Sequence, residues 1–433
     1  MSAGPLIVQS DRTVLLETGH PQAKDARHEL AIFAELERAP EHIHTYRITR
    51  LGLWNARAAG HDAEFIIESL KRWSKYPVPE GVEREIRSTI DRYGKLVIDR
   101  DEIGLRLSGA TPAILIEVAS NRKISDLLDE RLENAYRVKD WARGQLKQEL
   151  LKLGWPAEDN AGFTPGTPFE ISLDESLWQL RDYQREAVNK FELGGSGVVV
   201  LPCGAGKTLV GAATMAEIKT NTLILVTNTV SARQWRDELL ARTSLREADI
   251  AEYSGSSKDI GPVTIATYQI LTTKRKGEFA HLELLNARDW GLIIYDEVHL
   301  LPAPIFKMTA DLQARRRLGL TATLVREDGR ESDVFSLIGP KRFDAPWKDI
   351  EAQGYIAPAS CYEVRVSLPD EVRMDYAIAD QDARFRIAAT ADAKMPIIRA
   401  LLKKHKDEPT LIIGQYLDQI EEVSQGLGIP KLT

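Results

Sequence analysis

The stretch Gly197–Thr208 reads Gly-Val-Val-Val-Leu-Pro-Cys-Gly-Ala-Gly-Lys-Thr, and it decides the fold. Its first part, Val198–Leu201, is a β-branched run typical of a buried parallel strand, and an apolar helical pattern starts directly after Thr208. A turn of small residues between a strand and a helix lets backbone N–H groups and the positive end of the helix surround a triphosphate. The predicted nucleotide-binding residues of this turn are Leu201, Pro202, Cys203, Gly204, Ala205, Gly206, Lys207 and Thr208.

Two of these residues have a specific predicted role. Lys207 supplies a point charge to the phosphates, and the hydroxyl of Thr208 is a candidate magnesium ligand. The strict P-loop pattern has glycine where this sequence has Leu201. An ordinary glycine loop before a helix is the alternative, but the flanking strand and helix favour the phosphate-binding interpretation.

A second buried-strand run, Gly291–Tyr295, delivers Asp296-Glu297-Val298-His299 at its C-terminal end. Open α/β sheets bind ligands at this end of their strands. We therefore expect Asp296 to hold magnesium, usually through water, and Glu297 to position and deprotonate the attacking water. A carboxylate pair after a strand can also cap the next helix, but the phosphate-binding turn upstream favours the catalytic role.

The overall composition excludes several other classes of protein. The 433 residues predict about three domains, because single cores stop growing well below this length. With 43% hydrophobic and 28% charged residues, no membrane-spanning stretch and no signal peptide, we expect a cytoplasmic protein. The two cysteines, Cys203 and Cys361, exclude a disulfide framework, a thiolate zinc site and a four-cysteine iron–sulfur cluster. A net charge of −7 means that any nucleic-acid-binding surface must be local.

Residues 1–109 predict an α+β N-terminal domain. A β-hairpin is expected over Pro5–Glu17, and an amphipathic helix from about Gln22 to Arg38. Three further helices and a second hairpin are expected at Thr49–Ala59, Asp62–Lys75, Val82–Tyr93 and Lys95–Leu107. This order is winged-helix-like, and winged helices dock proteins, pack inertly or bind DNA; we rank these roles in that order.

Residues 110–170 predict a small second α+β domain. Its expected elements are a strand at Ile114–Val118, a helix from about Ala142 to Leu153, a linker-like loop at Trp155–Pro168 and a strand at Phe169–Leu173. The residues of this region do not indicate a function.

Residues 171–345 predict a doubly wound parallel sheet. Strands at Thr222–Val226, Val263–Ala266, Leu292–Tyr295 and Leu318–Thr321 alternate with helical segments. Just upstream of the phosphate-binding turn, Leu-Arg-Asp-Tyr-Gln ends at residue 184 and contains two candidate nucleotide-binding residues. They are Arg181 and Gln184, and the glutamine amide can both donate to and accept from an adenine edge.

Polar clusters follow the ends of these strands. In an ATPase that moves along nucleic acid, hydroxyls, amides and helix N-termini at such places bind phosphates without reading bases. Thr and Asn are also common helix caps, and each cluster taken singly is better explained as a cap. The clusters contain Asn228, Thr229, Thr267, Tyr268, Thr321 and Thr323.

The order of these motifs resembles the xeroderma pigmentosum group B (XPB) family of superfamily-two helicases. This superfamily keeps only the Gly-x-Gly-Lys-Thr core of the P-loop, so Leu201 is compatible with it. The most specific part is Arg326-Glu327-Asp328, directly after Thr-Ala-Thr-Leu-Val. The resemblance extends over nearly the whole chain, including Pro5–Glu17, His42–Tyr46 and Gln353–Ala357.

The resemblance implies a RecA-like P-loop helicase domain with ATP and Mg²⁺ as cofactors. It implies an ATP-dependent 3′-to-5′ DNA helicase of DNA repair, here prokaryotic and associated with the nucleoid. In that family Gln184 would contact adenine, Thr321 and Thr323 would couple hydrolysis to domain motion, and His299 would join the DNA-coupling set. Arg326, Glu327 and Asp328 would act at the DNA fork. The damage-recognition domain would lie at residues 110–170 and a thumb-like insertion at about 370–393.

One departure from the family concerns the second helicase domain, predicted to start at residue 346. Its Gln-x-x-Gly-Arg-x-x-Arg helix supplies an arginine finger, which contributes about 10³–10⁵ in rate in P-loop enzymes. The sequence up to Thr433 contains no such motif, although Thr410–Ile413 resembles the first strand of that domain. We therefore expect a chain truncated within this domain that binds ATP weakly and hydrolyses it poorly.

Two alternatives remain open. The chain could be a duplex DNA translocase that remodels DNA without separating strands. It could also be a docking module with a regulatory ATPase, whose N-terminal domain recruits a nuclease or a repair complex. A membrane partner is not expected.

Overall fold

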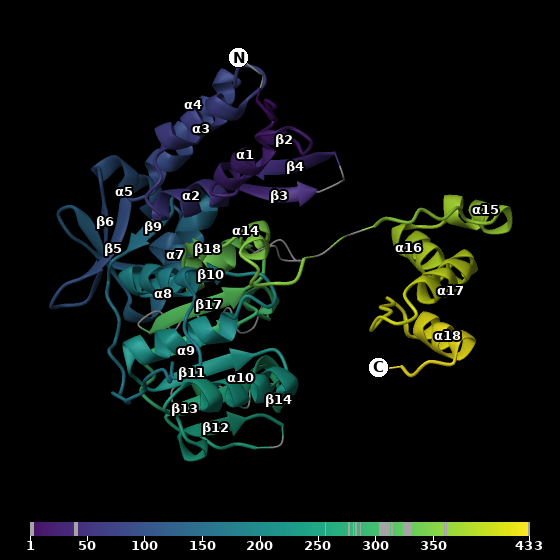
Figure 1. Cartoon of the computed structure of the whole chain (residues 1–433). Helices are drawn as coiled ribbons and strands as arrows, with labels where there is room; N and C mark the ends of the chain where they lie inside the picture. Colours follow the sequence, from purple (N-terminus) through teal and green to yellow (C-terminus); the bar gives the residue numbers. More distant parts are fainter. Residues whose placement is uncertain are drawn as a thin grey trace. The chain divides into compact units, whose positions relative to one another are not determined.

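The computed structural model describes residues 4–431 except 39–41, 256, 276–277, 280, 282–283, 286, 303–311, 313–314, 324–330, 359 and 361. For 274, 275, 278, 279, 331 and 348 it describes the backbone alone. The chain divides into two compact units, Met1–Ala357 and Pro358–Thr433 (Figure 1). Each unit is described by itself.

A seven-stranded sheet forms the centre of the first unit. Its order is β12-β13-β11-β16-β17-β10-β18, and all neighbouring strands are parallel. The predicted doubly wound sheet is therefore confirmed. The strands are β10 (Ser196–Val200), β11 (Thr222–Val226), β12 (Ile250–Tyr253), β13 (Val263–Thr267), β16 (Leu292–Asp296), β17 (Arg316–Thr321) and β18 (Lys341–Asp344).

Helices and short turns connect these strands. They are α8 (Asp182–Gly194), α9 (Lys207–Ile218), α10 (Thr229–Arg242), η2 (Glu247–Asp249), α11 (Tyr268–Thr272), η4 (Val298–Leu300), α13 (Glu331–Asp333), η6 (Val334–Ile338) and α14 (Trp347–Ala352). A small hairpin, β14 (Lys274–Arg275) with β15 (Glu278–Phe279), follows α11. Within the described residues, no helix combines the length and the apolarity that a bilayer crossing requires.

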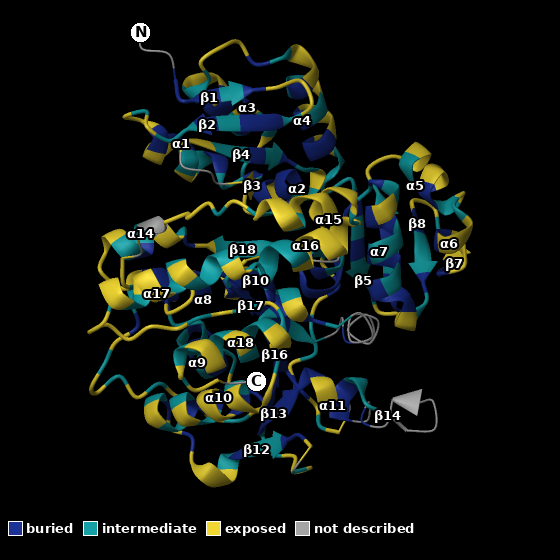
Figure 2. Cartoon of the chain, turned by 90° about the vertical axis from the view of Figure 1, so that its right-hand side faces the viewer, coloured by how far each residue is buried: buried dark blue, intermediate teal, exposed yellow. Residues whose placement is uncertain are grey.

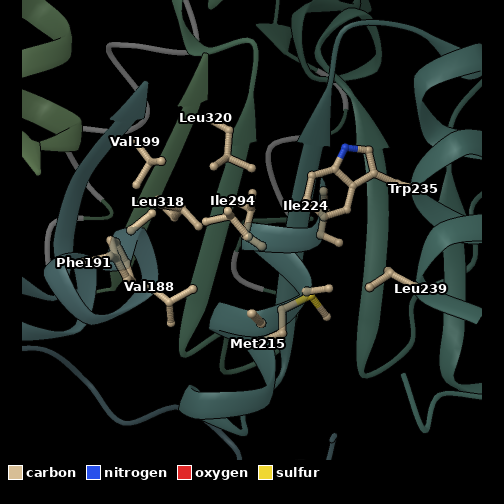
Figure 3. Packing of buried hydrophobic residues seen from close by; sticks show 14 of the residues in the cluster. Val188, Phe191, Val199, Met215, Ile224, Trp235, Leu239, Ile294, Leu318 and Leu320 are labelled. Carbon is tan, nitrogen blue, oxygen red and sulfur yellow. The ribbon is translucent and has the colours of Figure 1, made fainter. Parts of the chain in front are cut away.

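Alternate residues of the central strands enter two separate hydrophobic cores. Val199, Ile224 and Ile294 belong to the core that also contains residues of α8, α9 and α10, whereas Leu225 and Tyr295 belong to the opposite one. Figure 3 shows side chains of α8, α9 and α10 packed over the sheet. Burial on both faces is why the strands read as continuous apolar runs rather than as alternating patterns.

The N-terminal residues form an antiparallel sheet of order β1-β2-β4-β3 with helices against it. The elements are β1 (Leu6–Val8), β2 (Thr13–Glu17), α1 (Ala23–Leu30), β3 (Ala34–Arg38), β4 (Ile43–Ile48), α2 (Arg50–Ala58), α3 (Ala63–Trp73) and α4 (Glu80–Arg92). The first hairpin and the three later helices are confirmed. The long helix expected to Arg38 is wrong: it ends at Leu30, because Ala34–Arg38 pairs with β4 instead.

A second sheet, of order β7-β8-β6-β5-β9, follows. Its region contains β5 (Leu96–Arg100), β6 (Leu105–Gly109), α5 (Pro112–Ala119), α6 (Arg122–Ser125), β7 (Leu128–Arg131), β8 (Ala135–Val138), η1 (Asp140–Ala142), α7 (Arg143–Leu153) and β9 (Ala157–Asp159). The β5–β6 hairpin therefore pairs within this sheet and is not the wing of a winged helix. The hydrophobic core of the N-terminal sheet ends at Ile90, and that of the second sheet begins at Leu96.

Three other expectations for this region are wrong. Ile114–Val118 lies in helix α5, which starts with Pro112 after the N-cap Thr111. The expected loop Trp155–Pro168 contains β9, which pairs with β5. Phe169–Leu173 does not form a strand. Within it only Leu173 makes an isolated β-bridge, and the preceding Pro168 makes another.

A buried charge cluster joins the second sheet region to the parallel sheet. We define it as Arg143, Lys147, Asp159 and Arg317. Asp159 accepts hydrogen bonds from Arg143 Nη2 at 2.8 Å and Lys147 Nζ at 2.9 Å, and Arg317 of β17 is fully buried. The ring of Phe163 lies 5.9 Å from the Arg143 guanidinium and 5.8 Å from that of Arg317.

Further hydrogen bonds connect the same regions. Gln148 Nε2 donates to Asp333 Oδ1 at 2.9 Å, and the backbone N–H of Lys341 donates to Asn55 Oδ1 at 2.8 Å. The N-terminal sheet and the second sheet are thus attached to the parallel sheet through β17, β18 and α13.

The second unit is helical where it has regular structure. It contains α15 (Asp370–Ile378), α16 (Gln381–Ala389), η7 (Asp392–Lys394), α17 (Met395–Lys404) and α18 (Leu417–Leu427), and none of its described residues is buried (Figure 2). The paired helices expected at about 370–393 are confirmed. The strand expected at Thr410–Ile413 is wrong, since these residues have no strand pairing.

Candidate active site

The phosphate-binding turn lies between β10 and α9. Gly204 and Gly206 have φ angles of +78° and +80°, which glycine adopts without the strain that a Cβ causes. Gly206 precedes α9 and carries no side chain that could cap it. The first N–H groups of α9 are therefore available to an anion. In the same turn Leu201, Pro202 and Ala205 are buried and Cys203 is exposed.

Side chains of helix α8 hydrogen-bond to this turn. Tyr183 Oη and Gln184 Nε2 both donate to the carbonyl oxygen of Ala205, at 2.7 and 2.9 Å. Gln184 Oε1 accepts from the backbone N–H of Arg181 at 3.0 Å, and the Gln184 side chain is almost fully buried. Its amide therefore stabilises the turn in this structure, and its contact with adenine stays a prediction.

Arg181 contacts an aromatic residue from the end of the first unit. Its guanidinium lies 4.2 Å from the centre of the Tyr355 ring, and its Nη1 donates to Tyr183 Oη at 3.0 Å. The rings of Tyr183 and Tyr355 are 5.7 Å apart. The sequence analysis assigns no role to either tyrosine. The position of Tyr183 within the motif Leu-Arg-Asp-Tyr-Gln is the one sequence feature that points to it.

The register of the parallel sheet brings the two motifs together. Val200 pairs with Thr321, and Asp296 pairs with Leu320, so the turn after β10 and the residues after β16 lie at the same edge. Lys207 Nζ is 3.1 Å from Glu297 Oε1, and the two side chains are 12% and 26% exposed. Thr208 is in the first turn of α9, next to Lys207.

Asp296 is held by three hydrogen bonds. Its Oδ2 accepts from Trp235 Nε1 at 3.0 Å, and its Oδ1 accepts from the backbone N–H of Glu297 at 3.1 Å. Its backbone carbonyl accepts from Tyr268 Oη at 2.7 Å. Burial raises the pKa of Asp296, and the Trp235 hydrogen bond acts in the opposite direction.

Glu297 adopts a conformation that is uncommon for a residue with a side chain. Its φ is +47°, which costs about 1–3 kcal/mol and is found mainly where a function requires it. Its Oε2 is buried and makes no hydrogen bond to a described group. The site offers the Thr208 hydroxyl and the carboxylates of Asp296 and Glu297, and one Glu297 oxygen makes no hydrogen bond to a described group. These are oxygen donors of the kind that a hydrated Mg²⁺ prefers, so the residues fit the ion.

A chain of contacts leads from Glu297 to the end of β17. His299 Nδ1 lies 3.4 Å from Glu297 Oε2 and 2.7 Å from Thr321 Oγ1. The Thr321 hydroxyl donates to the carbonyl of Thr323 at 2.5 Å, so His299 Nδ1 must be the donor to Thr321. The structure thus brings Glu297, His299, Thr321 and Thr323 together.

The other polar clusters act as helix caps in this structure. Asn228 Oδ1 accepts from the backbone N–H of Ser231 and caps α10, and Thr267 Oγ1 accepts from that of Ile270 and caps α11. Thr229 is exposed, whereas the Tyr268 side chain is 3% exposed and points to Asp296. Arg326, Glu327 and Asp328 lie outside the described residues.

Two family models match parts of the sequence. Residues 6–133 match the family model "Helicase conserved C-terminal domain", and residues 177–326 match "Type III restriction enzyme, res subunit". Among solved structures, the crystal structure of the UvsW helicase from bacteriophage T4 is similar with a TM-score of 0.38 and 16% identity, over 58% of this chain and 100% of that chain.

Two bacterial relatives match almost the whole sequence. The DNA 3′-5′ helicase XPB of Kineococcus radiotolerans is 63% identical over 432 residues, which cover 99% of this chain and 78% of that protein. That of Mycobacterium tuberculosis is 60% identical, with 99% and 79% covered. This level of identity, together with the phosphate-binding turn and Asp296-Glu297 at one edge of a parallel sheet, shows that the chain belongs to the XPB family of DNA 3′-5′ helicases.

Proposed function

We propose that this chain is an ATP-dependent DNA 3′-5′ helicase whose ATP site lies between Lys207 and Glu297. The observation that carries the site assignment is the 3.1 Å contact between Lys207 Nζ and Glu297 Oε1 at the carboxyl edge of the parallel sheet. Family membership supports the activity. A role in DNA repair belongs to the proposal as well.

The site residues divide the work of hydrolysis. Lys207 and the N–H groups at the start of α9 bind the phosphates, and a phosphate oxygen replaces Glu297 as the partner of Lys207. Glu297, released from this ion pair, orients the attacking water and removes its proton. Thr208 and Asp296 would hold Mg²⁺, which when bound neutralises charge on the phosphates.

Glu297 is connected through His299 to the end of β17. Because His299 contacts both Glu297 and Thr321, breaking the Lys207–Glu297 pair alters the position of His299 and hence of Thr321 and Thr323. This chain of contacts supports the coupling role proposed for the two threonines.

The proposed DNA-binding residues lie at the ends of the strands. Asn228, Thr229 and Thr267 start α10 and α11, where helix N-termini and hydroxyls can bind backbone phosphates. We also propose a role at the DNA fork for Arg326, Glu327 and Asp328. A nuclease or repair-complex partner for the N-terminal sheet remains a proposal.

The variant Glu297→Gln tests the division of roles. It should bind ATP at least as well as the wild type, because Lys207 no longer has a competing carboxylate, but its DNA-stimulated hydrolysis should fall by about 10²–10⁴. Lys207→Ala should lose nucleotide binding itself. Glu217→Gln, at the exposed far end of α9, is the control and should leave both unchanged. Full hydrolysis by Glu297→Gln would rule out the proposed base.

A further inference from the structure

Trp235 of α10 fills the space between the phosphate-binding helix and Asp296. Its side chain is 1% exposed, and its Nε1 donates to Asp296 Oδ2 at 3.0 Å. On the other side the indole contacts α9: a Cβ on Gly211 would stand 2.4 Å from its Cη2 and 3.0 Å from its Cζ3. Figure 3 shows the indole lying beside Ile224 of β11. The indole is thus closely packed against α9 while it donates to Asp296.

Tyr268 of α11 holds Asp296 from a second direction. It is the first residue of that helix, it is 3% exposed, and its hydroxyl donates to the backbone carbonyl of Asp296 at 2.7 Å. Asp296 thus receives a side-chain hydrogen bond from α10 and a backbone hydrogen bond from α11. Neither bond is part of the hydrolysis chemistry described above.

The same two helices begin with residues proposed to bind DNA. Asn228 caps α10, and Trp235 follows seven residues later (235 − 228), which is about 10 Å along a rigid helix. Thr267 caps α11 and is directly followed by Tyr268. The α10 cap and Trp235 therefore belong to one continuous helix, and Thr267 is covalently next to Tyr268.

We infer that Trp235 and Tyr268 are positioning residues that connect DNA binding at the starts of α10 and α11 to the metal-binding carboxylate Asp296 of the ATP site. The inference rests on the proposed function, because it takes the ATP site and the two DNA-binding caps as given. It predicts that DNA and Mg-ATP change each other's affinity, and that the two hydrogen bonds carry part of this coupling.

The test uses the full chain with Trp235→Phe and Tyr268→Phe, which keep the ring and remove one donor. The first readout is the Mg²⁺ concentration that half-saturates binding of a fluorescent ATP analogue; it should rise about tenfold in Trp235→Phe, the loss expected for one hydrogen bond to a charged group. The second readout is the ratio of DNA affinities with and without Mg-ATP analogue. This ratio should move toward one in each variant.

Matched controls remove the same groups elsewhere in the same sheet region. Trp290→Phe removes a buried indole N–H that donates to the Leu284 carbonyl, and Tyr253→Phe removes a buried hydroxyl that lies 2.9 Å from His281 Nδ1. Both controls should keep the wild-type Mg²⁺ requirement and the wild-type affinity ratio, even where they lower thermal stability. Tyr268→Phe is the smaller change and decides the test if Trp235→Phe does not fold.

The outcomes separate this inference from the proposed function. If the wild type couples DNA and Mg-ATP but both variants behave like their controls, the inference is overturned and the proposed function stands. If the wild type binds no Mg-ATP, the proposed function fails and this inference fails with it. The inference is supported if Trp235→Phe and Tyr268→Phe show a higher Mg²⁺ requirement and reduced coupling while their controls do not.

Discussion

Replacing Asp159 with Asn should destabilise the attachment of α7 and β9 to the parallel sheet. Asp159 is the one carboxylate of the buried charge cluster, and its side chain is 14% exposed, against 4% for Arg143 and 8% for Lys147. The substitution leaves the buried cations Arg143, Lys147 and Arg317 without their counter-charge and turns one acceptor oxygen into a donor. Removing one partner of a buried ion pair costs about 3–5 kcal/mol.

Hydrogen exchange of the α7 backbone measures this loss locally, which avoids treating a multi-domain chain as two-state. A cost of that size corresponds to a fall of about 10²–10⁴ in the protection of the α7 amides at neutral pH, while β11 should change little. Asp140→Asn is the matched control, since Asp140 lies just before α7 and is 79% exposed at 3.9 Å from Arg100. A fall of less than about tenfold in Asp159→Asn would refute the reasoning.

The pKa of Asp159 determines how the stability difference between the wild type and Asp159→Asn depends on pH. Burial alone raises this pKa, but Lys147 and Arg143 outweigh burial and hold it well below the ordinary value of 3.8. The ionised carboxylate therefore stabilises the fold above that value, and the stabilisation is lost as the pH falls below it. The part of the stability difference that comes from the ionisation of Asp159 itself should stay constant from neutral pH down to about pH 5.

Other variants test separate parts of the account. Lys147→Met should cost less than Asp159→Asn, because burial lowers the pKa of Lys147 to about 8 and the cluster keeps a paired arginine; stability curves compare the two. Gly206→Ala should abolish nucleotide binding in a titration, because its Cβ would stand 2.4 Å from Gln184 Nε2 at a φ of +80°. Arg326→Ala should reduce strand displacement more than ATP hydrolysis, and equal loss of both would place Arg326 at the nucleotide.

The parts of the fold that sequence predicted are those with a local cause. The central strands of the parallel sheet, such as β11 and β16, are buried on both faces, so they leave continuous apolar runs such as Leu292–Tyr295. Helix α5 was missed because its Ile-Leu-Ile-Glu-Val run has strand propensity, whereas its true signals are Thr111 and Pro112 just before it. Strand β3 was missed because Ala-Glu-Leu-Glu-Arg favours a helix until β4 pairs with it.

The candidate site shows the same division. The phosphate-binding turn and Asp296-Glu297 could be predicted because each motif carries its chemistry within a few neighbouring residues. The roles of Trp235, Tyr268 and Tyr355 could not, because each depends on a contact with a residue far away in the sequence. Asp159 falls in the same class, since its partners lie on another element.

The central claim is that a triphosphate binds between Lys207 and Glu297. A crystal structure of this chain with Mg²⁺ and a non-hydrolysable ATP analogue tests it most directly. We predict phosphate oxygens within hydrogen-bond distance of Lys207 Nζ and of the backbone N–H groups of residues 204–208, with Lys207 and Glu297 separated by more than about 4 Å. An analogue bound elsewhere, with the 3.1 Å contact between Lys207 and Glu297 intact, would contradict the account.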